Sequence, residues 1–172
     1  MLEHVLKKVT PKFNKTLIIS NRSLNIKKTN SVDIVPDCIQ GNLGPLVGVL
    51  TAMKWIKKNN EKYQWVATFP FDTPFFDKKI IEEYKSKINL NESSLYFVKS
   101  NEKRHNIFGL WSLKLIDDLE KDIRSNNFRK VELWANKIGV RYVEVDTKKF
   151  DKFFNINTLD DFEEAKKNID KI

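Results

Sequence analysis

The sequence contains very little cysteine and histidine. Its 172 residues include one cysteine, Cys38, and two histidines. A single cysteine cannot form an internal disulfide or a cysteine metal cluster, which fits a reducing compartment such as the cytoplasm. With so few of these residues, a zinc site and a serine or cysteine hydrolase triad are both disfavoured.

Long apolar segments are also lacking. No run approaches the roughly 20 apolar residues that a membrane-spanning helix needs. The N-terminal segment has no basic flank leading into a long apolar block, so it does not read as a secretory signal. We therefore expect a cytoplasmic protein without a membrane partner. Its length suits a single domain covering residues 1–172.

The common glycine-rich phosphate motifs are missing as well. Neither G-x-G-x-x-G nor G-x-x-x-x-G-K-[ST] occurs in the chain. Nucleotide-binding α/β domains usually open with a strand and a glycine-rich turn. This sequence opens instead with apolar residues at helical spacing: Leu2, Val5, Leu6 and Val9.

The charge balance is basic, with a formal net charge of +8. Such a balance suits polyanionic ligands, either nucleic acid or phosphorylated small molecules. The lysines are scattered in pairs along the chain, and no basic stripe with interleaved aromatic residues is present. We therefore interpret the charge as surface composition and expect no nucleic-acid partner.

Strand and helix patterns alternate over most of the sequence. Short apolar or alternating runs predict strands at 16–20, 32–35, 65–68, 94–98, 106–111 and 141–145. Helical spacing of apolar residues predicts helices at 2–9, 45–53, 80–88, 115–123 and 131–138, and a capping box at 158–161 opens a last one. The order predicts a three-layer α/β domain with a mostly parallel sheet.

Three polar residues follow predicted strands: Asn21, Asp37 and Asp72. Ligands of α/β sheets bind at the carboxyl ends of the strands, so these side chains could converge on one edge. Asp72 lies between Pro70 and Pro74, which stiffen the backbone, and a carboxylate there suits Mg²⁺ bound together with substrate phosphates. The alternative for Asp72, and for Asn21 as a base or ribose contact, is an ordinary turn residue.

Other polar residues give weaker signals. Arg104 and His105 precede a predicted strand and could contact an anionic group, or could form a loop pair without a role. The four tryptophans fall inside predicted helices or strands, so we expect core positions rather than a stacking platform.

Six short motifs occur in a consistent order along the chain: L-I-I-S-N-R (17–22), V-P-D (35–37), G-P-L-V-G-V-L (44–50), F-P-F-D-T-P-F (69–75), H-N-I-F-G-L-W (105–111) and F-N-I-N-T-L-D-D (154–161). In this order they resemble the molybdenum cofactor guanylyltransferases, nucleotidyltransferases with a Rossmann-like fold. Related cytidylyl and sugar enzymes more often carry a G-D-x-P segment in place of P-F-D-T-P.

The resemblance implies a reaction and roles for particular residues. The terminal phosphate of molybdenum-molybdopterin would attack the α-phosphate of GTP, giving molybdopterin guanine dinucleotide and pyrophosphate. Asn21 and Asp37 would contact GTP, and Asp72 would hold Mg²⁺ as the catalytic residue. Asn155 and Asn157 match the family's N-x-N-T segment and, with Arg104 and His105, would lie on the substrate side. The expected partners are GTP, molybdenum-molybdopterin, and molybdoenzymes or other cofactor-biosynthesis proteins.

The sequence departs from the family pattern in two places. Asn106 follows His105 where the family usually has proline. The family also opens with a strand and an L-A-G-G-x-S-x-R-M-G-x-D-K loop around the triphosphate. This chain starts at the segment matching the following helix, so about 30 residues, including the first strand, would be missing. We therefore expect an open sheet edge. A non-catalytic nucleotide- or pterin-binding accessory protein and a CTP-dependent transferase are the alternatives.

Overall fold

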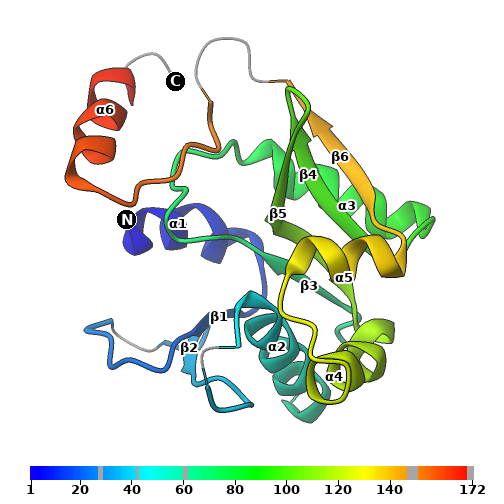
Figure 1. Cartoon of the computed structure of the whole chain (residues 1–172). Helices are drawn as coiled ribbons and strands as arrows, with labels where there is room; N and C mark the ends of the chain where they lie inside the picture. The colour runs from blue at the N-terminus through cyan, green and yellow to red at the C-terminus, as the bar shows by residue number, and fades with distance from the viewer. Residues whose placement is uncertain (27–28, 42, 60–61, 147–150, 170–172) are drawn as a thin grey trace.

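The computed structural model describes residues 1–26, 29–41, 43–59, 62–146 and 151–169. Strands and helices alternate along most of the chain, as the sequence predicts (Figure 1). The helices are α1 (Leu2–Val9), α2 (Pro45–Asn59), α3 (Lys79–Leu90), α4 (Ile116–Arg124), α5 (Val131–Ile138) and α6 (Leu159–Ile169). The strands are β1 (Thr16–Ile19), β2 (Val32–Val35), β3 (Trp65–Thr68), β4 (Leu95–Ser100), β5 (Lys103–Ser112) and β6 (Arg141–Val145).

The larger sheet has the strand order β3-β5-β4-β6. β4 and β6 are parallel, whereas β5 is antiparallel to both of its neighbours. β3, β4 and β6 therefore run in one direction, and β5 runs in the opposite direction. The predicted mostly parallel sheet is confirmed, with β5 as the exception. The reason is local. Asn101 and Glu102, with φ of 45° and 65°, form a two-residue turn between β4 and β5, and so short a turn joins only antiparallel strands.

β1 and β2 form a separate, parallel sheet. Within the described part of the chain, β1 and β3 do not pair with each other, although α2 contacts both strands. The sheet is thus open between β1 and β3. β1 and β3 therefore each have one edge that pairs with no described strand.

The core lies on both faces of the larger sheet, as the sequence of β4 shows. Leu95 and Phe97 pack with residues of α2, α4 and α5, whereas Tyr96 and Val98 pack with residues of α1 and α3. All four side chains are at most 1% exposed. Because alternate strand residues point to opposite faces, the predicted three-layer arrangement of helices, sheet and helices is confirmed.

The tryptophans belong to this core, as the sequence predicts. The rings of Trp111 and Trp134 stack 6.0 Å apart, and both side chains are fully buried. Trp55 and Trp65 are partly buried and pack against the two sides of the core.

The last helix, α6, begins at the predicted capping box and is only partly buried. Thr158 and Asp161 form the expected capping box, in which the Asp161 amide donates to Thr158 Oγ1 (3.1 Å) and the Thr158 amide donates to Asp161 Oδ2 (2.8 Å). Ala165 is fully buried, but Leu159 is 75% exposed and Phe162 is 38% exposed. Ala165 packs in a cluster with Phe75 and Ile156.

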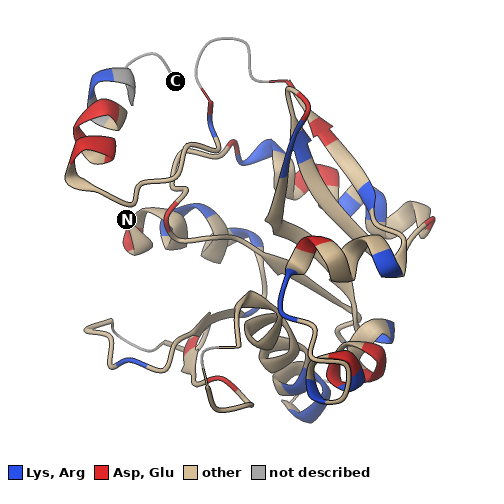
Figure 2. Cartoon of the chain, in the orientation of Figure 1, with Lys and Arg blue, Asp and Glu red and all other residues tan. Residues whose placement is uncertain are grey.

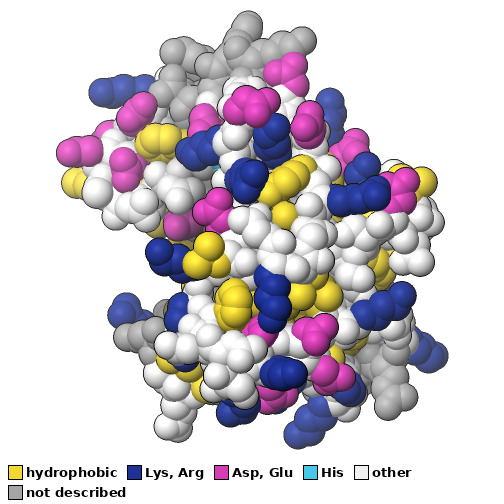
Figure 3. All heavy atoms as spheres, turned by 45° about the vertical axis from the view of Figure 1, so that its right-hand side comes forward, with side chains coloured by type: hydrophobic (Ala, Val, Ile, Leu, Met, Phe, Trp, Pro, Cys, Tyr) yellow, Lys and Arg dark blue, Asp and Glu magenta, His cyan; other side chains and the backbone are white. Residues whose placement is uncertain are grey.

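Basic residues occur on most elements of the fold (Figure 2). On the face shown in Figure 3, lysine and arginine side chains lie interspersed with aspartate and glutamate. This distribution fits the interpretation of the positive charge as surface composition. Among the described residues, no helix combines the length and apolar character needed to cross a membrane.

Candidate active site

Asn21 and Asp37 are brought together by the pairing of β1 with β2. Ile19 lies opposite Val35 in the parallel register, so both strands end at the same level. The Asn21 amide nitrogen donates to Asp37 Oδ2 (2.8 Å), and the backbone amide of Asp37 donates to Asn21 Oδ1 (2.9 Å). The two predicted nucleotide contacts thus form one unit at the ends of two strands.

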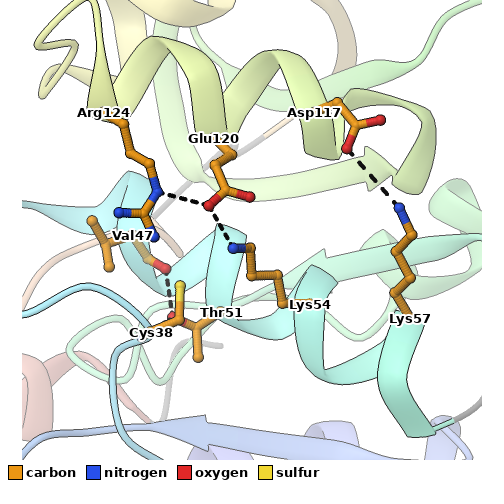
Figure 4. Close-up of polar contacts among 8 residues, drawn as sticks. All are labelled: Cys38, Val47, Thr51, Lys54, Lys57, Asp117, Glu120 and Arg124. Carbon is orange, nitrogen blue, oxygen red and sulfur yellow. Dashed lines mark hydrogen bonds and ion pairs between the residues drawn. The ribbon is translucent and has the colours of Figure 1, made fainter.

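Thr51 of α2 holds the next residue along the chain. The backbone amide of Cys38 donates to Thr51 Oγ1 (2.9 Å), and the hydroxyl donates to the Val47 carbonyl (2.7 Å; Figure 4). Asp37 therefore lies between two anchors, Asn21 just after β1 and Thr51 on α2. The sequence did not single out Thr51. The available signal was a polar residue among the apolar residues of a predicted helix.

Helix α2 also contacts α4 through charged side chains (Figure 4). Glu120 accepts from Lys54 (2.6 Å) and from Arg124 (2.7 Å), and these hydrogen bonds hold the pKa of Glu120 below its usual range. Lys57 and Asp117 are 4.0 Å apart and largely exposed. The buried apolar side chains of α2 and α4 belong to one cluster, and this packing holds α2, and with it Thr51, in place.

Asp72 lies in the turn after β3, as predicted. Its side chain is partly exposed, and the neighbouring Thr73 is 1% exposed. Thr73 Oγ1 is 2.7 Å from Asn155 Oδ1 and 3.2 Å from Asp72 Oδ1. The backbone amide of Ile156 donates to the Asp72 carbonyl (2.7 Å). The structure therefore joins two motifs that are more than 80 residues apart in sequence.

The segment that carries Asn155 is docked at several further points. Phe153 is 2% exposed, and the imidazole of His105 stacks on its ring at 4.1 Å. Lys152 is paired with Asp77 (3.2 Å), and Asp151 lies 3.5 Å from Lys103. These contacts place residues 151–157 over the end of the sheet that also carries the Asp72 turn.

His105 helps to hold residues 151–157 in place, because its ring packs on Phe153. Its Nε2 is 2.7 Å from Ser100 Oγ, and its ring is half-buried. Burial lowers the pKa of His105 to about 4, against an opposing effect of Asp151. The imidazole is therefore neutral near pH 7 and does not provide a cation for an anionic substrate.

Arg104 and Asn157 lie apart from these contacts. The Arg104 guanidinium is 3.5 Å from Glu132 and stacks over the Tyr142 ring at 5.2 Å, on the α5 and β6 side of the sheet. The backbone amide of Asn157 donates to Asp161 Oδ2 (2.9 Å), within the cap of α6. In the part of the chain that is described, no hydrogen bond or ion pair connects either residue to Asp72.

The two polar groups, Asn21–Asp37 and Asp72–Thr73–Asn155, lie in different parts of the sheet. In Figure 1 the chain leaves β1 and β3 toward the same, left-hand side of the molecule. No hydrogen bond between described residues links one group to the other. A ligand that contacts both groups would have to extend along the edge where the sheet is open.

The donor set at Asp72 fits a metal only together with a substrate. Within the described ranges, no group of three or more histidine, cysteine, aspartate or glutamate residues could hold a metal ion. Asp72 offers one carboxylate, of which Oδ1 is contacted by Thr73 and Oδ2 has no partner among the described residues. Mg²⁺ is commonly bound by one or two carboxylates plus substrate phosphates, so Asp72 fits this type of site and not an all-protein cage.

Comparison with known proteins identifies a family. The family model described as the MobA-like NTP transferase domain matches residues 1–136. A molybdenum cofactor guanylyltransferase from Rhizobium rhizogenes is 34% identical over 144 residues, which cover 81% of this chain and 66% of that protein. Curated relatives from Nitrobacter hamburgensis and Rhizobium meliloti have the same name.

Solved structures show the same fold. The molybdopterin-guanine dinucleotide biosynthesis protein A of Archaeoglobus fulgidus superposes with a TM-score of 0.72 at 21% identity, covering 99% of this chain and 85% of that one. A manganese complex of a Mycobacterium tuberculosis protein superposes with a TM-score of 0.61 at 12% identity, covering 95% of this chain and 84% of that one. Residues 151–157 lie beyond the range that the family model matches.

Proposed function

Because the chain belongs to the MobA-like NTP transferase domain family, we propose that it acts as a molybdenum cofactor guanylyltransferase. It would transfer GMP from GTP to the terminal phosphate of molybdopterin and release pyrophosphate. The proposal is supported by curated relatives with that name. The observation that carries it in this chain is the joining of the Asp72 turn to Asn155 at the end of β3.

The residues divide into two functional groups in this proposal. Asn21 and Asp37 would bind the nucleotide through the hydrogen-bonding positions that their mutual contact leaves open, which include Asp37 Oδ1 and the second Asn21 amide hydrogen. Asp72 would act at the phosphates, with Asn155 and Asn157 on the molybdopterin side. His105 would support the segment around Asn155, since its ring packs on Phe153.

Asp72 would hold Mg²⁺ together with phosphate oxygens of the nucleotide. The ion would neutralise charge on the triphosphate, which is the main requirement of phosphoryl-transfer chemistry. Asp72 itself would position the ion through Oδ2, which has no hydrogen-bond partner among the described residues. Its Oδ1 and backbone carbonyl remain engaged by Thr73 and Ile156.

The experiment is a pyrophosphate-release assay on this chain with molybdenum-molybdopterin, Mg²⁺ and either GTP or CTP. We expect turnover with GTP and formation of the guanine dinucleotide, identified by mass spectrometry. Turnover with CTP in preference to GTP would replace guanylyl by cytidylyl transfer. Nucleotide binding without pyrophosphate release, measured by calorimetry, would favour an accessory binding protein instead.

A further inference from the structure

We propose that Thr73 is a positioning residue for Asp72, which it orients through a hydroxyl shared with Asn155. The inference rests on the proposed role of Asp72 at the metal and phosphates. It assigns to Thr73 a part in that site, which neither the sequence motif nor the similarity to known proteins specifies.

The hydroxyl of Thr73 has few possible partners. The residue is 1% exposed, so water does not compete for the hydroxyl. Its Oγ1 lies 2.7 Å from Asn155 Oδ1 and 3.2 Å from Asp72 Oδ1, and these are its hydrogen-bond contacts among the described residues. A hydroxyl has one proton to donate and two lone pairs that accept. One threonine therefore connects the carboxylate to a segment from the other end of the chain.

The amide of Asn155 determines how this proton is used. With Asn155 Oδ1 facing Thr73, both neighbours are acceptors and compete for one proton. A half-turn of the amide exchanges its oxygen and nitrogen, which have nearly the same shape. In that orientation Thr73 would accept from the Asn155 amide and donate to Asp72, so that both contacts would be hydrogen bonds. Hydrogen bonds in such a chain polarise and strengthen one another.

The two oxygens of the Asp72 carboxylate therefore have different surroundings. Oδ1 is engaged by the Thr73 hydroxyl, whereas Oδ2 has no partner in the described part of the chain. Rotation of the carboxylate would break the contact at Oδ1. The hydroxyl thus favours the orientation that leaves Oδ2 available to a cation, as hydrogen-bonded partners of metal-binding carboxylates generally do.

The docking of the segment does not depend on this hydroxyl. The Ile156 amide donates to the Asp72 carbonyl (2.7 Å), and the Ile156 side chain is 4% exposed in a cluster with Phe75 and Ala165. Phe153 is separately anchored by His105. Removing the hydroxyl should therefore leave residues 151–157 in place and affect mainly the side chains of Asp72 and Asn155.

The experiment compares GTP affinity in excess Mn²⁺ with GTP affinity in EDTA, using calorimetry on the full chain. The ratio of the two dissociation constants measures the contribution of the metal. We expect Thr73→Val to reduce this ratio by roughly 10-fold, the typical effect of losing a hydrogen-bonded partner of a metal ligand. Thr73→Ser, which keeps the hydroxyl, should restore it. Affinity in EDTA should be the same for all of these variants.

Thr16→Val is the matched control. Thr16 Oγ1 is also buried but has no hydrogen-bond partner among the described residues, so the same substitution there removes no hydrogen bond. We expect the wild-type ratio for this variant. Asp72→Asn tests the underlying proposal, since it should abolish the metal dependence. If Thr73→Val keeps the wild-type ratio while Asp72→Asn loses the metal dependence, the positioning role of Thr73 is overturned. The proposed role of Asp72 would then still stand.

Two further outcomes separate the inference from the proposed function. An unchanged ratio in Asp72→Asn would remove the metal from Asp72 and overturn both. If GTP affinity of the wild-type chain does not depend on the metal, the proposed function fails for this chain. Crystal structures of wild type and Thr73→Val then test the positioning role separately. Several orientations of the Asp72 carboxylate in the variant would support that role, and one unchanged orientation would overturn it.

Discussion

Asn21 and Asp37 hold each other through two hydrogen bonds across the adjacent ends of β1 and β2. The amide of Asn21 donates to the carboxylate of Asp37 and accepts from its backbone N–H, at 2.8 and 2.9 Å. Two residues that the sequence suggested as separate nucleotide contacts are therefore one structural unit. Changing either residue should disturb the other.

The first prediction concerns this pair. Asn21→Ala and Asp37→Ala should each weaken GTP binding by roughly 10-fold, because hydrogen bonds to charged groups contribute about 1.5–3 kcal/mol. The double variant should be little worse than either single variant, since each change already breaks the unit. Calorimetric titration with GTP measures all three, with Lys57→Met at the far end of α2 as the control. Fully additive losses would show that the residues act independently.

The second prediction concerns Asp72. In an active form of the enzyme, Asp72→Ala should lower the rate of Mg²⁺-dependent transfer at least about 100-fold, because it removes the protein's ligand to the ion. The fold should persist, since the Asp72 contact to Ile156 uses the backbone carbonyl. Pyrophosphate release and circular dichroism measure the two effects. Asp117→Ala, at a largely exposed carboxylate on α4, is the control. Near-normal turnover of Asp72→Ala would remove Asp72 from the active site.

The third prediction follows from the pKa of His105, which burial lowers to about 4. An unfolded histidine has a pKa of about 6.5, so between about pH 6.5 and 4 the unfolded chain binds more protons at this residue. The contribution of His105 to stability is therefore fully present above pH 6.5 and is lost as the pH falls through this window. His105→Phe should stack on Phe153 without this loss.

Urea unfolding at several pH values tests the third prediction. The free energy of unfolding of His105→Phe should rise relative to wild type as the pH is lowered from 6.5 to 4, whereas His4→Gln, at an exposed position on α1, should show a much smaller change. In NMR spectra the His105 ring should not titrate between pH 5.5 and 8. A titration midpoint near the pKa of about 6.5 expected for free histidine would contradict the buried placement.

The fourth prediction concerns the stability of the α4–α5 contact. Asp122 is 1% exposed. Burial alone would raise its pKa, but hydrogen bonds from Lys137, Asn126 and Trp134 hold the pKa below the usual range. Lys137→Met should therefore reduce the free energy of unfolding by about 1–2 kcal/mol, a value that allows for the partial exposure of the lysine. Lys57→Met breaks an exposed pair and should cost less than about 0.5 kcal/mol. Equal effects in urea unfolding would contradict this difference.

The fifth prediction compares two glycine substitutions. A Cβ on Gly109 of β5 would lie 2.4 Å from Trp111 Nε1, so Gly109→Ala should destabilise the protein by about 1–3 kcal/mol. A Cβ on Gly48 of α2 would meet Ile19 Cγ2 at an ordinary 3.7 Å, so Gly48→Ala should stabilise by about 0.5–1 kcal/mol. Thermal unfolding of both variants gives the sign. A stable Gly109→Ala protein would show that the Trp111 ring can move away.

The sequence by itself determined the elements and the family. Apolar patterns predicted the strands and the first five α-helices, because burial of one face selects the period of the pattern, and a capping box predicted the last helix. The position of Asp72 at the end of β3 also followed from local signals, namely an apolar run that ends between Pro70 and Pro74. The direction of β5 did not follow, since it depends on the turn at Asn101 and Glu102 and on pairing with β3.

Only the tertiary structure decided which polar residues meet. Asn21 contacts Asp37 because the register of β1 and β2 aligns their ends, and Asn155 meets Thr73 because its segment packs through Phe153 and Ile156. Local sequence determines neither the register of the strands nor the packing of distant segments, because both depend on how buried faces from different parts of the chain fit together. The same reason separates Arg104, which pairs with Glu132, from the Asp72 turn, although the family resemblance implied that Arg104 lies on the substrate side of the site.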